Sequence, residues 1–153
     1  MSRRAKYQRK ARRTTRMKNY RDFIRITSTD LFEVLDITTE VSRVLAASGI
    51  QDGMALLFPH HTSCAVYLSD SDRNLTEDFK TLLGQLVPDG AYKHDLADDK
   101  KNARAHLMSL IAGPNLTLPV TEGSLDLGVY QRVYYAEFDG QREKEILIKV
   151  IGD

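Results

Sequence analysis

The last forty residues constrain the fold most, because they consist almost entirely of short apolar runs separated by turn pairs. The runs cover Leu116–Val120, Leu125–Leu127, Val129–Phe138 and Lys144–Ile151. Glu122-Gly123 and Asp139-Gly140 separate them, and Asp-Gly between two long alternating runs is typical of a β-hairpin. Helices do not alternate with strands here, which disfavours a doubly wound parallel sheet. The pattern predicts an α+β domain built mostly of antiparallel strands.

The first three quarters of the chain predict further strands together with two or three short helices. Strands are expected over residues 20–27, 32–37, 54–58 and 64–68, and helices over residues 39–48, 74–86 and 102–112. The second helix has the clearest apolar face, formed by Leu75, Phe79, Leu82, Leu83 and Leu86. Asn74 and Glu77 resemble a capping box at its start, while Ser69–Arg73 is expected to be a loop. Gly49 is the expected C-cap of the first helix.

The charge is distributed unevenly along the 153 residues. Residues 1–21 carry ten Lys and Arg and no acid, and the rest holds the other 12 basic residues and all 21 acidic ones. We therefore divide the chain into a basic arm, residues 1–18, and one domain, residues 19–153. The arm has few apolar residues and is expected to be disordered. Three other interpretations remain open: weak contact with nucleic-acid phosphates, an organelle transit peptide, or translation that starts at Met17.

Cysteine content and hydropathy bear on the environment of the protein. A single cysteine excludes an intrachain disulfide framework and suits the cytoplasm. No apolar run approaches the roughly 20 residues of a membrane helix, and no secretory signal is visible. We expect a cytoplasmic protein without membrane contact.

Three of the four histidines lie in polar, loop-like segments. His61 precedes Thr62-Ser63, His94 precedes Asp95, and His106 lies four residues after Asn102 on one face of the expected third helix. Three neutral imidazoles and a water form an open metal site of the Lewis-acid type. Asp98 and Asp99 could accept hydrogen bonds from the imidazole N–H groups. No short-spaced motif links the histidines, so scattered, unrelated histidines are the alternative.

Other polar or reactive residues near these histidines have weaker signals. Thr62 and Ser63 follow a strand and offer donors for a phosphate group, although an ordinary turn has the same composition. A P-loop and a G-x-G-x-x-G motif are both missing. Cys64 is expected to be an inert packing residue. Tyr130, Tyr134 and Tyr135 are expected in the core or an interface, and the alternative is a platform on which a ligand stacks.

Five segments in the expected order resemble the YjbQ family, also called UPF0047 or the secondary thiamine-phosphate synthase family. They are His61-Thr62-Ser63-Cys64-Ala65, Tyr92-x-His94-Asp95, Asn102-x-x-Ala105-His106-Leu107, the run from Leu118-Pro119-Val120 through Gly123-x-Leu125-x-Leu127-Gly128 to Gln131, and Glu137-Phe138-Asp139-Gly140-x-Arg142. The resemblance extends from about residue 20 to the C-terminus. It implies a compact, jelly-roll-like α+β sandwich of mostly antiparallel strands that assembles as a homotrimer.

The resemblance also implies a metal-dependent activity on phosphorylated small molecules. The family is associated with joining a hydroxymethylpyrimidine diphosphate to a thiazole phosphate, which yields thiamine phosphate and pyrophosphate. By this likeness His61, His94 and His106 hold a divalent metal, with zinc as the candidate. Thr62 and Ser63 bind phosphate, and Asn102 orients phosphate or a metal-bound water. Asp70 and Gln131 contact the organic part of the substrate, and His60 has no role and should point elsewhere.

Departures from the family pattern leave the activity open. Ser69 and Ser71 replace two Asn residues, Tyr130 replaces a Trp, and Gln141 replaces a Pro. These changes alter the expected substrate rim more than the histidines. Whether the protein is an enzyme is therefore undecided. The alternatives are a non-catalytic trimer that binds a metal or a small anion, and a nucleic-acid-associated protein that uses residues 1–18.

Overall fold

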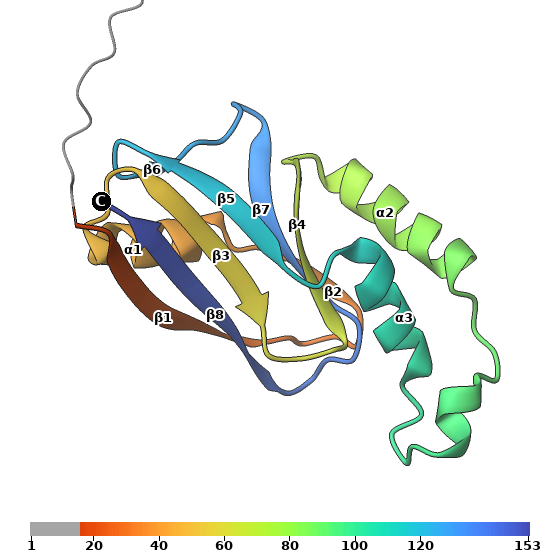
Figure 1. Ribbon diagram of the computed structural model, residues 1–153. Coiled ribbons are helices and arrows are strands. Elements are labelled where there is room, and N and C mark those ends of the chain that lie inside the picture. Colours follow the sequence, from red (N-terminus) through yellow and green to blue (C-terminus); the bar gives the residue numbers. More distant parts are fainter. Residues whose placement is uncertain (1–15) are drawn as a thin grey trace, which may run out of the picture.

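The computed structural model describes residues 16–153, which form two antiparallel sheets with three α-helices and a 3-10 turn (Figure 1). The elements in chain order are β1 (Lys18–Thr27), β2 (Glu33–Asp36), α1 (Thr38–Ser48), β3 (Gly53–Pro59), β4 (Cys64–Asp70), α2 (Arg73–Leu86), η1 (Lys93–Leu96), α3 (Ala103–Ala112), β5 (Leu116–Thr121), β6 (Ser124–Leu125), β7 (Gln131–Glu137) and β8 (Glu143–Gly152). The expected α+β class is confirmed. The greater part of the expected basic arm, residues 1–15, lies outside the described residues. None of the described helices is long and apolar enough to cross a membrane.

The strands divide into a five-stranded sheet in the order β1-β8-β3-β5-β6 and a three-stranded sheet in the order β2-β7-β4. Consecutive strands β7 and β8 belong to different sheets, so the hairpin expected at Asp139-Gly140 is wrong. The chain instead crosses from one sheet to the other at this point. Gly140 is required by a close approach, since a Cβ there would lie 2.1 Å from the carbonyl oxygen of Asp30. The β1–β2 connection makes the same crossing and packs against this corner.

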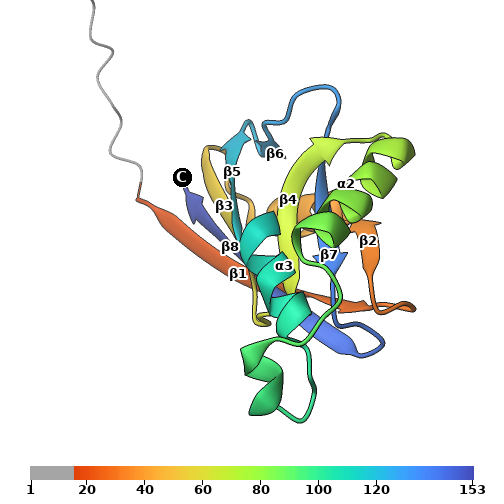
Figure 2. The same cartoon turned by 90° about the vertical axis from the view of Figure 1, so that its right-hand side faces the viewer.

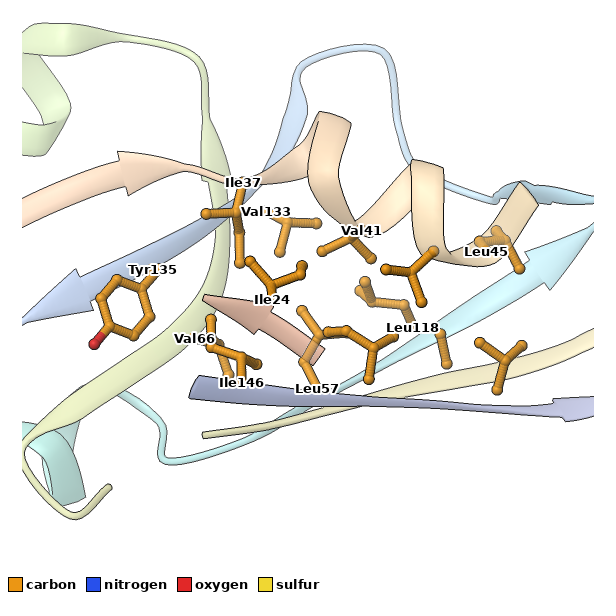
Figure 3. Close-up of a cluster of buried hydrophobic side chains, with 14 of the residues drawn as sticks. Ile24, Ile37, Val41, Leu45, Leu57, Val66, Leu118, Val133, Tyr135 and Ile146 are labelled. Carbon is orange, nitrogen blue, oxygen red and sulfur yellow. The ribbon is translucent and has the colours of Figure 1, made fainter. Parts of the chain in front are cut away.

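The main core lies between the two sheets and includes α1 (Figure 3). Alternate residues of β8, namely Ile146, Ile148 and Val150, face it together with Val41 and Leu45 of α1. Every second residue of β8 is buried, because successive side chains of a strand point to opposite faces and only one face of β8 lies against the core. Gly49 ends α1 in the left-handed conformation (φ 64°), which confirms the expected C-cap.

A second, smaller apolar cluster lies on the other side of the three-stranded sheet, where α2 and α3 cover it (Figure 2). Leu83, Met108 and Phe138 are among its buried members. α3 packs directly against β4, which fixes the start of α3 close to the β3–β4 turn. This contact brings the segments carrying three of the histidines together.

Two local predictions at α2 were wrong. β4 continues through Asp70, so Ser69 and Asp70 are not in a loop. The N-cap of α2 is Asp72, whose carboxylate accepts from the backbone N–H of Asn74; a shorter Asx contact therefore replaces the expected capping box. On the expected apolar face only Leu83 is fully buried, while Leu82 and Leu86 are about half exposed. The helix is amphipathic, but this chain alone covers only part of its apolar face.

Candidate functional site

A polar pocket of about 630 Å³ lies where four segments of the chain meet. The segments are the β3–β4 turn, η1 with the loop after it, the start of α3, and the corner between β7 and β8. The lining residues are His60, His61, Thr62, Ser63, His94, Ala97, Asp98, Lys100, Asn102, His106 and Arg142. Six of the predicted site residues are thus together, although up to 45 positions separate them in the sequence.

An adjoining, more apolar pocket of about 860 Å³ shares part of this lining. His60, His61, Thr62, His94 and His106 border both pockets. Phe58, Pro59, Leu110 and Pro114 supply apolar surface on the far side. A ligand with a charged end and an apolar end therefore finds both environments on either side of the histidines.

His94 and His106 form the closest imidazole pair, with ring centroids 5.1 Å apart and planes at 85°. Nδ1 of His106 lies 2.9 Å from the carbonyl oxygen of Thr62. Because a carbonyl only accepts, the neutral ring carries its proton on Nδ1 and keeps the Nε2 lone pair free. Nε2 of His94 lies 3.5 Å from Oδ2 of Asp98, one of the two carboxylates expected beside the imidazoles. His106 thus has one nitrogen held and one available, while His94 has one nitrogen facing a carboxylate.

His61 is oriented differently, because the backbone N–H of Glu145 donates to its Nε2 at 3.2 Å. A neutral His61 then carries its proton on Nδ1 and has no free lone pair. Its pKa is lowered, first by burial and then by the nearby charge of Lys144. Within residues 16–153, no three or more His, Cys, Asp or Glu side chains are grouped to hold a metal ion. The three-histidine metal site therefore stays a prediction.

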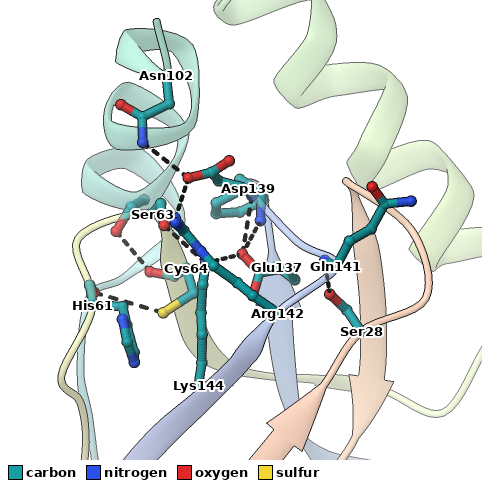
Figure 4. Close-up of polar contacts among 12 residues, drawn as sticks. Ser28, His61, Ser63, Cys64, Asn102, Glu137, Asp139, Gln141, Arg142 and Lys144 are labelled. Carbon is teal, nitrogen blue, oxygen red and sulfur yellow. Dashed lines mark hydrogen bonds and ion pairs between the residues drawn. The ribbon is translucent and has the colours of Figure 1, made fainter. Parts of the chain in front are cut away.

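Ser63 is buried and connects the pocket to an ion pair beneath it (Figure 4). Nζ of Lys144 donates to Ser63 Oγ at 2.9 Å and is paired with the carboxylate of Glu137. Both charged side chains are 1% exposed. Glu137 also accepts from the Tyr135 hydroxyl at 2.8 Å and from the backbone N–H groups of Phe138 and Asp139. These contacts satisfy the carboxylate, as a buried charge requires.

Asn102 is held at the rim of the pocket by the β7–β8 corner. Its Nδ2 donates to Oδ2 of Asp139 at 2.9 Å, and the same oxygen is paired with Arg142 (Figure 4). An ionised Asp139 can only accept, so the orientation of the amide is fixed. The Asn102 Oδ1 atom is buried and has no hydrogen-bond partner in the described part of the chain.

The structure does not bring Asp70 and Gln131 to this pocket within one chain. They are cross-strand partners at the far ends of β4 and β7. The rise of about 3.3 Å per strand residue puts them roughly 20 Å along β4 from Cys64. Tyr134 and Tyr135 of the same strand are buried, as expected for core tyrosines, whereas Tyr130 is exposed.

Sequence reasoning missed Lys144 and Glu137, although one signal for Lys144 was present. Lys144 has the same parity along β8 as Ile146, Ile148 and Val150, all of which face the core. A lysine on the buried face of a strand needs a buried partner, and that partner is Glu137. His60 was expected to point elsewhere. Its ring packs edge-on against Phe23 and Phe58, although the residue also borders the pocket.

Cys64 follows Ser63 but takes no part in the pocket. It is fully buried, and burial raises the pKa of its thiol to about 11. A thiol with this pKa is almost entirely protonated at neutral pH, and the thiolate is the nucleophilic form. The expected packing role agrees with this environment.

The fold and the pocket define a class of small α+β proteins in which a histidine-rich cleft lies beside two packed antiparallel sheets. The family model described as "UPF0047 protein YjbQ-like" matches residues 22–153, and the chain belongs to this family. The UPF0047 protein of Methanothermobacter thermautotrophicus is 38% identical over 121 residues, which cover 78% of this chain and 83% of that protein. The UPF0047 protein YugU of Bacillus subtilis is 31% identical over 131 residues, or 84% and 97% of the two chains.

Solved structures agree with this assignment. A YbjQ-like protein of unknown function from Sulfolobus solfataricus superposes with a TM-score of 0.85 at 35% identity, covering 90% of this chain and 100% of that one. A hypothetical protein from Aeropyrum pernix gives a TM-score of 0.82 at 32% identity, covering 88% and 99%. The family and its fold are therefore established for this chain.

Proposed function

We propose that the polar pocket binds the phosphate end of a phosphorylated small molecule together with a divalent metal ion. The observation that carries this proposal is the composition of one pocket: imidazoles from three segments beside the cations Lys100 and Arg142 and the hydroxyls of Thr62 and Ser63. Cations and hydroxyl donors are the groups that bind phosphate oxygens. The apolar pocket beyond the histidines would take the organic part of the ligand.

The residues that best fit a metal are His94 and His106. His106 has one nitrogen held by a carbonyl oxygen and one left with a lone pair, which is the usual arrangement of metal-binding histidines, and Nε2 of His94 faces Asp98 at 3.5 Å. His61 can join them only if its ring gives up the hydrogen bond from Glu145. Zinc is the candidate, and the bound ion would supply Lewis-acid stabilisation of charge on a phosphate oxygen.

The proposed reaction class is displacement of a diphosphate group, with thiamine phosphate formation as the case to test. In that scheme Arg142, Lys100 and the hydroxyls of Thr62 and Ser63 hold the departing diphosphate and offset its growing charge. The chain's own contribution is to bind this group and to keep it beside the apolar pocket.

A specific observation favours a second candidate, binding without turnover. The resemblance placed Asp70 and Gln131 on the organic substrate. Both lie far from the histidines, at the far ends of β4 and β7. Within one chain, the pocket therefore has residues for the phosphate but lacks these two residues for the organic part. A protein that only binds a small anion or a metal ion does not need them.

We also propose that the protein assembles as a homotrimer. Support comes from the outer face of the five-stranded sheet, where Phe23, Leu147 and Phe58 lie in one cross-strand row. Figure 1 shows these strands in front, with α1 behind them. Met54 on the same face is 54% exposed, and Phe58 is 44% exposed. An exposed apolar row of this kind on a small protein is typical of an interface.

Calorimetric titration with zinc and with pyrophosphate, each alone and together, tests the binding proposal. We expect zinc to bind the wild-type protein and to strengthen pyrophosphate binding. Assays with the two thiamine precursors then separate turnover from binding. A protein that binds neither zinc nor pyrophosphate would contradict the proposal.

A further inference from the structure

Fold stability alone does not explain the buried ion pair between Lys144 and Glu137. A buried pair seldom stabilises a fold more than apolar residues of the same size would. The two side chains nevertheless lie under the pocket floor at 1% exposure, and Glu137 is fixed by three donors besides Lys144. The carboxylate is thus a rigid anchor that holds one ammonium group in one place.

The direction of the next hydrogen bond follows from chemistry. An ammonium group has only donors, so Ser63 Oγ must accept from Lys144. The hydroxyl proton of Ser63 then points away from Lys144. Within residues 16–153, this contact is the one hydrogen bond found for Ser63 Oγ, and Ser63 lines the polar pocket. Its O–H group is therefore available to an acceptor in the pocket.

We propose that Lys144 is a positioning residue that fixes the Ser63 hydroxyl as a hydrogen-bond donor to an anionic oxygen of the ligand. This inference deepens the proposed phosphate binding and rests on it. Lys144 is paired with Glu137 and donates to Ser63 Oγ, so the Ser63 O–H group faces the ligand as a donor. Arg142 on the same pocket wall supplies further donors to the same anion.

Pyrophosphate affinity, measured by calorimetry at fixed ionic strength, tests this inference in four variants. Ser63→Ala removes the donor and should weaken binding about 10- to 100-fold, the effect of one hydrogen bond to a charged group. Lys144→Met should weaken it similarly, and the double variant should be no weaker than either single one. Lys144→Arg keeps a charged donor and should retain part of the affinity, which a purely structural role would not explain.

Two further variants keep the test interpretable. Ser28→Ala is the matched control, because Ser28 is equally buried and accepts from the backbone N–H of Gln141 outside the pocket. It should leave the affinity unchanged. If Lys144→Met does not fold, Glu137→Gln combined with Lys144→Met removes the unpaired buried charge and should fold with weak binding.

The outcomes separate the two proposals. Wild-type protein without measurable pyrophosphate affinity would overturn both. Wild-type binding that Ser63→Ala leaves intact would overturn the role of Ser63 and Lys144 alone, and so would additive losses in the double variant.

Discussion

The imidazole rings of His94 and His106 meet edge to face, with centroids 5.1 Å apart. The two residues come from different segments, η1 and α3. Nδ1 of His106 lies 2.9 Å from the carbonyl oxygen of Thr62, and Nε2 of His94 lies 3.5 Å from Oδ2 of Asp98. The Thr62 contact fixes the tautomer of His106 and the direction of its free nitrogen. This pair is therefore where we propose that the metal ion binds.

Replacing either ring of this pair should weaken zinc binding most. We expect His94→Ala and His106→Ala each to lower zinc affinity at least about tenfold, and Asp98→Asn to have a smaller effect in the same direction. His60→Ala is the control, since His60 borders the pocket but packs between two phenylalanines. Metal analysis after dialysis and zinc titration give the measurement. Equal losses in His60→Ala and His94→Ala would contradict the assignment.

The sequence predicted elements better than it predicted how they meet. Period-2 patterns located β8 and its core residues, because a strand with one buried face has a local signature. The same pattern could not show that β7 and β8 lie in different sheets, since Asp139-Gly140 fits a hairpin and a crossing equally well. The close approach of Gly140 to Asp30 distinguishes the crossing from a hairpin, and Asp30 is 110 positions away in the sequence.

The candidate site shows the same limit. His61, His94 and His106 have no common spacing, so their polar contexts and the family resemblance were the signals that grouped them. The packing of α3 on β4 and on η1 explains why they line one pocket. Asp70 was grouped with them by resemblance but lies at the other end of β4. Asp70 is only nine positions from His61 in the sequence, but the length of β4 separates the two residues in space.

The exposed apolar row on the outer face of the five-stranded sheet should decide the oligomeric state. Phe58→Asp puts a charge in the row formed with Phe23 and Leu147, so we expect it to shift the protein from trimer to monomer. Leu31→Asp is the matched control, because Leu31 is an exposed apolar residue in the β1–β2 loop. Light scattering at micromolar concentration measures both masses. A wild-type monomer would reject the trimer itself.

Gln141 should tolerate glycine but not proline. Its φ is 65°, and its backbone N–H donates to Ser28 Oγ at 3.0 Å. Proline fixes φ near −65° and has no N–H, so Gln141→Pro should lower the free energy of unfolding by at least about 2 kcal/mol. Gln141→Gly should change it by less than about 1 kcal/mol, because glycine adopts positive φ freely. The resembled family motif carries Pro here, so a stable Gln141→Pro variant would show that the corner can take a second conformation. Urea unfolding of the three proteins measures the difference.

Cys64 should make the folded protein less stable at alkaline pH. Burial raises its pKa from 9.0 to about 11, so the unfolded chain loses the thiol proton first. Stability from this group is complete below pH 9 and declines as the pH rises from 9 to 11, by about 2 to 3 kcal/mol in total. Buried tyrosines titrate in the same direction, so the measurement is the difference between wild type and Cys64→Ala in urea unfolding at pH 8 and pH 10.5. The stability of the wild type should fall more steeply than that of the variant. Parallel slopes, or rapid labelling of the native thiol at pH 8, would show that Cys64 is accessible and not a packing residue.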